Sequence, residues 1–74
     1  MDNKEKLLEL FNRTYSNCKH YKECGKDQHL LNEIGVLRGI AYCIGEIVDE
    51  ENLFSVINFA EFSEMIDEQE RLRN

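Results

Sequence analysis

Four residues with metal-binding side chains lie close together in the sequence and offer its sharpest possibility for chemistry. They are two cysteines and two histidines within twelve residues: Cys18, His20, Cys24 and His29. Thiolate and imidazole are the ligands that zinc prefers. The spacing, however, matches no familiar zinc-finger or zinc-knuckle pattern. In one continuous helix Cys18 and His20 would point about 200° apart, so the four side chains can converge only if a helix ends near Asn17.

Cys24 also has neighbours that could assist a nucleophilic thiol. His20 or His29 could act as the base that takes the thiol proton, and nearby lysines favour the thiolate form. No third group to orient a histidine is evident, and so small a chain rarely encloses the roughly 300 Å³ or more of a substrate pocket. We therefore expect no catalytic residue, no metal ligand and no cofactor, and a protein that is not an enzyme. A small zinc-stabilised helical module remains the alternative.

The segments that carry these residues have the apolar spacing of helices, and the chain contains no proline. A first helix is predicted from Asn3 to about Glu23, where apolar residues recur at intervals of three and four. Gly25 is suited to end this helix because glycine readily adopts the left-handed conformation, and Asp27 can cap the next one. The connection between the two helices is therefore expected to be tight.

A second helix is predicted from Gln28 to Val48, and its apolar residues form two adjacent rows. The first row is Leu30, Ile34, Leu37, Ala41, Ile44 and Val48, and the second is Val36, Ile40, Cys43 and Ile47. The two rows cover nearly half of the helix circumference. We therefore expect this helix to be central, packed between at least two neighbours from the chain itself or from a second copy. By its spacing, Cys43 is expected in the core.

Three residues of the second helix need a separate explanation. Gly35 and Gly39 lie on its more polar side, where each costs about 1 kcal/mol relative to alanine. They either let a loop or the first helix approach closely, which we favour, or belong to a docking face for a partner. Glu33 projects into the apolar arc, and we expect it to reach solvent at the edge of the core rather than to form a buried ion pair.

The C-terminal third contains a further helical stripe and then a change of face. Asn58, followed three residues later by Glu61, resembles a capping box, so we expect a bend or a break near Asn58. The fold class predicted is all-α: a small three- or four-helix bundle in a single domain, 1–74, with a central apolar helix at about 28–48. A chain of this size buries only about 60% of its unfolded surface, which favours a homodimer.

Charge is distributed unevenly along the chain. The net charge is −6; residues 1–38 hold seven bases and six acids, whereas residues 39–70 hold nine acids and no base. This acidic half disfavours binding to phosphates and favours a partner with a basic surface, although acidity for solubility alone is the simpler explanation. The residues expected to bind the partner are Glu46, Glu50, Glu51, Glu61, Glu64, Asp67 and Glu68.

The function predicted is a non-enzymatic acidic interaction protein that binds, and inhibits or modulates, a protein partner that handles nucleic acid. Small size, acidity and the lack of chemical motifs are typical of accessory proteins and inhibitors of phages and mobile elements. A helix-turn-helix regulator is a further alternative, but its candidate recognition helix carries acids that repel DNA. The chain shows neither a signal peptide nor a membrane-spanning run, and three cysteines do not form a disulfide framework, so we expect a cytoplasmic protein.

Overall fold

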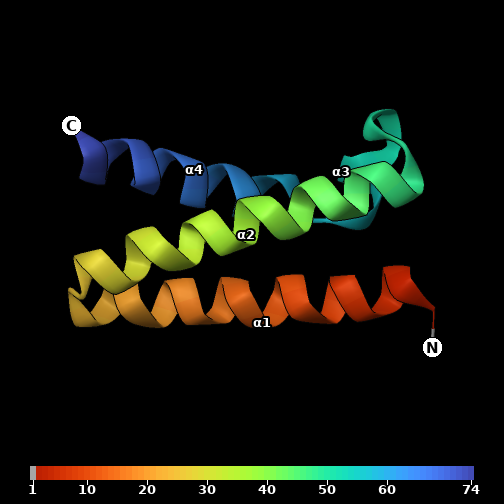
Figure 1. Ribbon diagram of the computed structural model, residues 1–74. Helices are drawn as coiled ribbons and strands as arrows, with labels where there is room; N and C mark the ends of the chain where they lie inside the picture. Colours follow the sequence, from red (N-terminus) through yellow and green to blue (C-terminus); the bar gives the residue numbers. More distant parts are fainter. Residues whose placement is uncertain (1) are drawn as a thin grey trace.

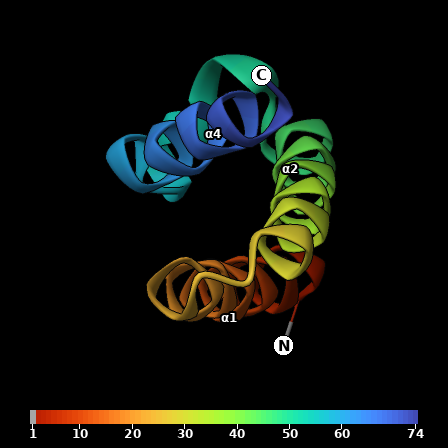
Figure 2. The same cartoon turned by 90° about the vertical axis from the view of Figure 1, so that its left-hand side faces the viewer.

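The computed structural model describes residues 2–74 as an all-α bundle, which confirms the predicted fold class (Figure 1). Two long helices, α1 (Asn3–Cys24) and α2 (Asp27–Val48), are followed by a 3-10 turn, η1 (Glu50–Asn52), a short α3 (Leu53–Val56) and α4 (Phe59–Arg73). α2 runs antiparallel to both α1 and α4. In the end-on view of Figure 2, α2 lies between α1 and α4, and the three helices form an open arc. α2 is thus the central helix, as predicted.

Local sequence chemistry sets the boundary between the first two helices. Gly25 has a φ of 71°, in the left-handed region, and ends α1 as predicted. The next N–H, that of Lys26, donates to the Tyr21 carbonyl at 3.0 Å, which satisfies a free carbonyl of the last turn. Asp27 is the first residue of α2 rather than its cap, so that part of the prediction was wrong. Its carboxylate still lies at the positive end of the helix dipole.

The predicted break near Asn58 is confirmed. α3 ends at Val56, and α4 starts at Phe59. The Asn58 side-chain oxygen accepts a hydrogen bond from the Glu61 backbone N–H at 3.2 Å, which is the capping contact that the spacing predicted. No helix within residues 2–74 combines the length and the apolar character needed to cross a membrane.

The core is built mainly from one row of α2 and the facing sides of α1 and α4. Its largest fully buried side chains are Phe11, Cys18, Leu30, Ile34, Leu37, Ile44 and Met65. The second predicted row is different: Ile40 is buried, but Val36 and Ile47 are 48% and 49% exposed, and Cys43 is also exposed. The placement of Cys43 in the core was therefore wrong. The reason is the arrangement of the helices: α1 and α4 both lie on one side of α2 (Figure 2), and the first row is the one buried against them.

Two of the helical glycines have no packing explanation inside the bundle. A methyl group added at Gly35 or Gly39 would meet no atom of the described chain within 4 Å, whereas one at Gly45 would contact Leu53 at 3.9 Å. The expectation that a segment of the same chain approaches Gly35 and Gly39 closely was wrong. Their cost of about 1 kcal/mol each in helix propensity is therefore not offset by packing within residues 2–74.

Candidate interaction surface

The cysteine and histidine residues are not brought together, because α1 continues without interruption to Cys24. Cys18 is fully buried in the core, and Cys24 is exposed at the end of the helix. Burial, with a smaller effect of the nearby Glu33 carboxylate, raises the pKa of the Cys18 thiol to about 11. A zinc ligand must be a thiolate, so this environment works against metal binding at Cys18.

The other members of the set make contacts of a different kind. The Cys24 sulfur lies 3.7 Å from His20 Nε2, one helical turn away. His29 packs edge-on against Tyr21, with ring centroids 5.3 Å apart. Within residues 2–74, no three His, Cys, Asp or Glu side chains are grouped so that they could hold a metal ion. The geometry that the zinc alternative requires is not formed.

Two shallow depressions occur on the surface of the bundle. One, of about 210 Å³, is lined by Tyr21, His29, Asn32 and Glu33. The other, of about 310 Å³, is lined by Lys19, Lys22, Glu23 and Glu64. Neither lining includes Cys24, the residue with the best arrangement for a nucleophile. Glu33 lies at the edge of the core as expected, half-buried, where it accepts a hydrogen bond from Asn17 at 3.3 Å.

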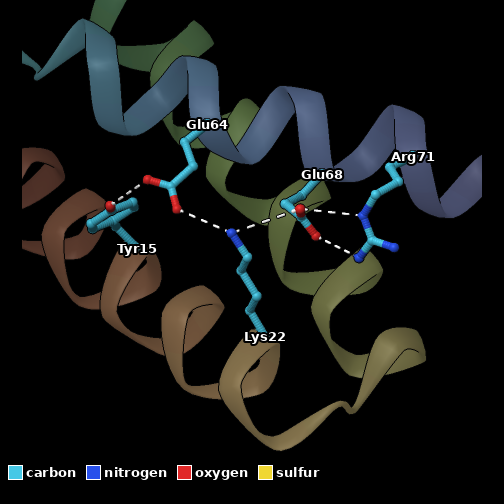
Figure 3. A network of polar contacts seen from close by, with 5 residues as sticks. All are labelled: Tyr15, Lys22, Glu64, Glu68 and Arg71. Atoms are coloured by element: carbon cyan, nitrogen blue, oxygen red, sulfur yellow. Dashed lines mark hydrogen bonds and ion pairs between the residues drawn. The ribbon is translucent and has the colours of Figure 1, made fainter.

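Two of the seven acids expected to bind a partner instead connect α4 to α1. Figure 3 shows the Lys22 ammonium between Glu64 and Glu68, at 3.3 and 3.7 Å from their carboxylate oxygens. Tyr15 donates a hydrogen bond to Glu64 at 3.3 Å, and Arg71 forms an ion pair with Glu68 at 2.7 Å. The two carboxylates thus have cationic partners within the bundle.

The environment of Glu68 favours its charged form. Its side chain is only 14% exposed. The hydrogen bond from Arg71, with further attraction from Lys22, lowers the pKa of the Glu68 carboxyl below its ordinary value, although partial burial opposes this shift. On α1, partial burial and the adjacent Glu64 carboxylate raise the pKa of the Tyr15 phenol. Glu64 and Glu68 are therefore better suited to holding α4 in place than to meeting an external partner.

The other five acids lie at different places on the bundle. Glu46 is on the last turns of α2, and Glu50 and Glu51 are in η1. Glu61 is half-buried in the first turn of α4, and Asp67 is exposed further along that helix. No ion pair within the described residues involves any of these five. The seven acids therefore do not act as one uniform surface, and those of η1 lie directly before the exposed Phe54 in the chain.

Next to η1 the structure contains an exposed aromatic cluster that the sequence analysis did not identify. Phe54 and Phe59 are 49% and 58% exposed, and their rings meet edge-on with centroids 4.9 Å apart. Phe54 also approaches Phe62, which in turn lies 6.1 Å from the buried ring of Phe11. One signal was available in the sequence: Phe54 falls outside the stripe formed by its apolar neighbours in α3. We call Glu50, Glu51, Phe54 and Phe59 the acidic aromatic tip.

No protein-family model, no curated protein and no solved structure matches the chain. Functional interpretation therefore depends on the residues and their geometry alone.

Proposed function

We propose that this protein is a non-enzymatic, cytoplasmic interaction protein whose acidic aromatic tip binds a protein partner with a basic surface and thereby inhibits or modulates it. The observation that carries the proposal is the exposed Phe54–Phe59 pair, which follows in the chain two carboxylates that form no ion pair within residues 2–74. Aromatic side chains are enriched in protein interfaces because they bury a large apolar area in few residues.

The two kinds of group in the tip would make different contributions to binding. The phenylalanine rings would enter an apolar depression of the partner and provide most of the affinity. Glu50 and Glu51 would surround that contact, accelerate association with a basic surface and disfavour wrong partners. The rings are already in contact with each other, so less conformational entropy is lost when they bind.

The partner class that best fits this chemistry is a protein that handles nucleic acid. Surfaces that hold a phosphate backbone are rich in lysine and arginine, and an acidic protein is attracted to them while it repels nucleic acid itself. A small acidic protein on such a surface would compete with the nucleic acid for its site. This is the activity expected of an accessory or inhibitor protein.

The test is affinity capture from nuclease-treated lysate of the protein's source, with matched charge variants. Glu50→Lys/Glu51→Lys changes the tip, and Asp67→Lys/Glu70→Lys gives the same change of net charge on exposed residues of α4. We expect the wild type and the α4 variant to recover a basic protein that elutes in high salt, and the tip variant to lose it. Equal recovery by both variants, or binding insensitive to salt, would contradict the proposal.

A further inference from the structure

The side of α2 that faces away from the bundle is apolar and has no neighbour within the described chain. Its outer face consists of Val36, Gly39, Cys43 and Ile47, which follow the three-and-four spacing of one helical stripe. Val36 and Ile47 are each about half exposed. Figure 2 shows α1 and α4 on one side of α2, and the buried residues of α2, which pack against them, lie on a different side of the helix from Val36 and Ile47. The apolar residues of α2 thus extend over more of its circumference than one copy of the chain covers.

α1 extends this outer face with one more exposed apolar residue. The hydrogen bond between Asn17 and Glu33 sets the level at which the antiparallel helices α1 and α2 face each other. Leu10 precedes Asn17 by seven residues, and Ile40 follows Glu33 by seven, which is two helical turns in the same direction along the antiparallel pair. Leu10 and Ile40 therefore face each other on the same side of the pair as Asn17 and Glu33. Leu10 is 38% exposed. The uncovered apolar surface therefore spans two helices.

The glycines make this surface accessible to another helix. Around Gly35 and Gly39 the space where a Cβ would lie contains no atom of residues 2–74 within 4 Å. Without side chains at these positions, the backbone of a second helix can come close to α2. The resulting contact would bury Val36 and Ile47 and explain why glycine occupies two exposed positions in the middle of a long helix.

The charges at the two ends of α2 indicate what covers the face. At its start, Lys19, Lys22 and Lys26 are largely offset by Glu23 and Asp27, whereas Glu46 and Asp49 lie at its end in a region without any base. An antiparallel second copy would bring the slightly positive end of each α2 next to the acidic end of the other and keep the two acidic ends apart. The two helix dipoles would also be opposed, which is the favourable orientation. A second copy in this orientation therefore fits the charge of the two ends, and the open space at Gly35 and Gly39 admits its helix.

We propose that the outer face of α2 binds a second copy of this chain, antiparallel, about a two-fold axis that passes close to Gly39 and Ile40. This register places Val36 opposite the partner's Cys43 and Asn32 opposite the partner's Ile47. The interface is isologous and therefore closes as a dimer. The proposal does not depend on the function proposed above. Glu50 lies close to Gly45, on the buried side of α2, so the dimer leaves the acidic aromatic tips free.

Sedimentation velocity tests whether the dimer forms through this face. The wild type should sediment as twice the 8.8 kDa chain. Val36→Glu/Ile47→Glu should raise the dissociation constant roughly 100-fold or more, because each copy would bury two charges without cationic partners in a desolvated contact. Phe59→Glu, which adds a charge at an equally exposed apolar residue outside the face, should leave the dimer intact. Circular dichroism verifies that each variant stays helical. A monomeric wild type, or equal dissociation of both variants, would overturn the proposal.

Disulfide formation tests the orientation of the two copies. In a Cys24→Ser background, Val36→Cys should form a disulfide with the partner's Cys43 and give a covalent dimer under mild oxidation. The same variant with Cys43→Ser should stay uncrosslinked. The two introduced thiols, one from each copy, would be about 10 Å apart along the axis of α2, which is beyond disulfide reach. Crosslinking that persists without Cys43 would indicate a parallel pair and contradict the antiparallel arrangement.

Discussion

Replacing Gly35 and Gly39 by alanine should stabilise the isolated chain substantially. Both positions are exposed, neither has a positive φ, and an added methyl group meets nothing within 4 Å in the described chain. The gain therefore comes from helix propensity alone, about 1 kcal/mol for each glycine and about 2 kcal/mol for the pair. For a domain of this size such a gain raises Tm by roughly 8–16 °C.

The assay is urea denaturation followed by circular dichroism, in the Val36→Glu/Ile47→Glu background, so that a second copy contributes nothing. The midpoint should rise while the m-value stays constant, because the surface exposed on unfolding is unchanged. Gly25→Ala is the matched control with the opposite sign: its φ of 71° requires the left-handed conformation, so the same added methyl group should destabilise. An unchanged or lower midpoint for Gly35→Ala/Gly39→Ala would refute the reasoning.

Further predictions concern the core and the α1–α4 contact. The monomeric Val36→Glu/Ile47→Glu variant, treated with a thiol-alkylating reagent at about pH 8, should be labelled at Cys24 and Cys43 but not at the buried Cys18; mass spectrometry that finds all three labelled would contradict the fold. Met65→Ala should lower the free energy of unfolding by about 2–5 kcal/mol, because Met65 is fully buried; denaturation that shows a loss below about 1 kcal/mol would mean that α4 is only loosely packed. The pKa of Glu68 is lowered from 4.5 in the folded state, so its contribution to stability is complete above pH 4.5 and is lost as pH falls below that value. Glu68→Gln should therefore weaken the decline of Tm between about pH 5 and about pH 3, and an identical decline in the two proteins would exclude this role.

The parts of the fold that depend on local chemistry could be predicted from the sequence. Gly25 ends α1 because it adopts a conformation that other residues avoid, and Asn58 starts α4 because its side chain reaches the Glu61 N–H. The first apolar row of α2 is buried as predicted except for Val48, which is partly buried, because a helix in a small bundle must turn such a row toward its neighbours. These features require only residue types and their spacing.

The parts that depend on which helices meet could not be predicted in the same way. The periodicity of α2 identified Val36, Cys43 and Ile47 as apolar neighbours of the core, but only the positions of α1 and α4 decide that this row stays uncovered. Cys43 therefore satisfied the spacing of a core residue and is nevertheless exposed.

The same limit applies to the acidic residues. Glu64 has the spacing of an exposed helix position, and its charge is balanced by Lys22, a residue 42 positions earlier in the chain. Sequence spacing cannot reveal such a partner, because it describes only neighbours on the same helix. The exposed pair of Phe54 and Phe59 likewise results from the break between α3 and α4, which brings two rings from different helices together.

The most direct test of the acidic aromatic tip as the binding surface is site-specific photocrosslinking in cells of the protein's source. A photoreactive phenylalanine analogue replaces Phe59 in the tip or, as the control, Glu70, which is exposed on α4. We expect the probe at position 59 to form an adduct with a basic protein and the probe at position 70 to form none with it. No adduct at position 59, or the same adduct at both positions, would contradict the account.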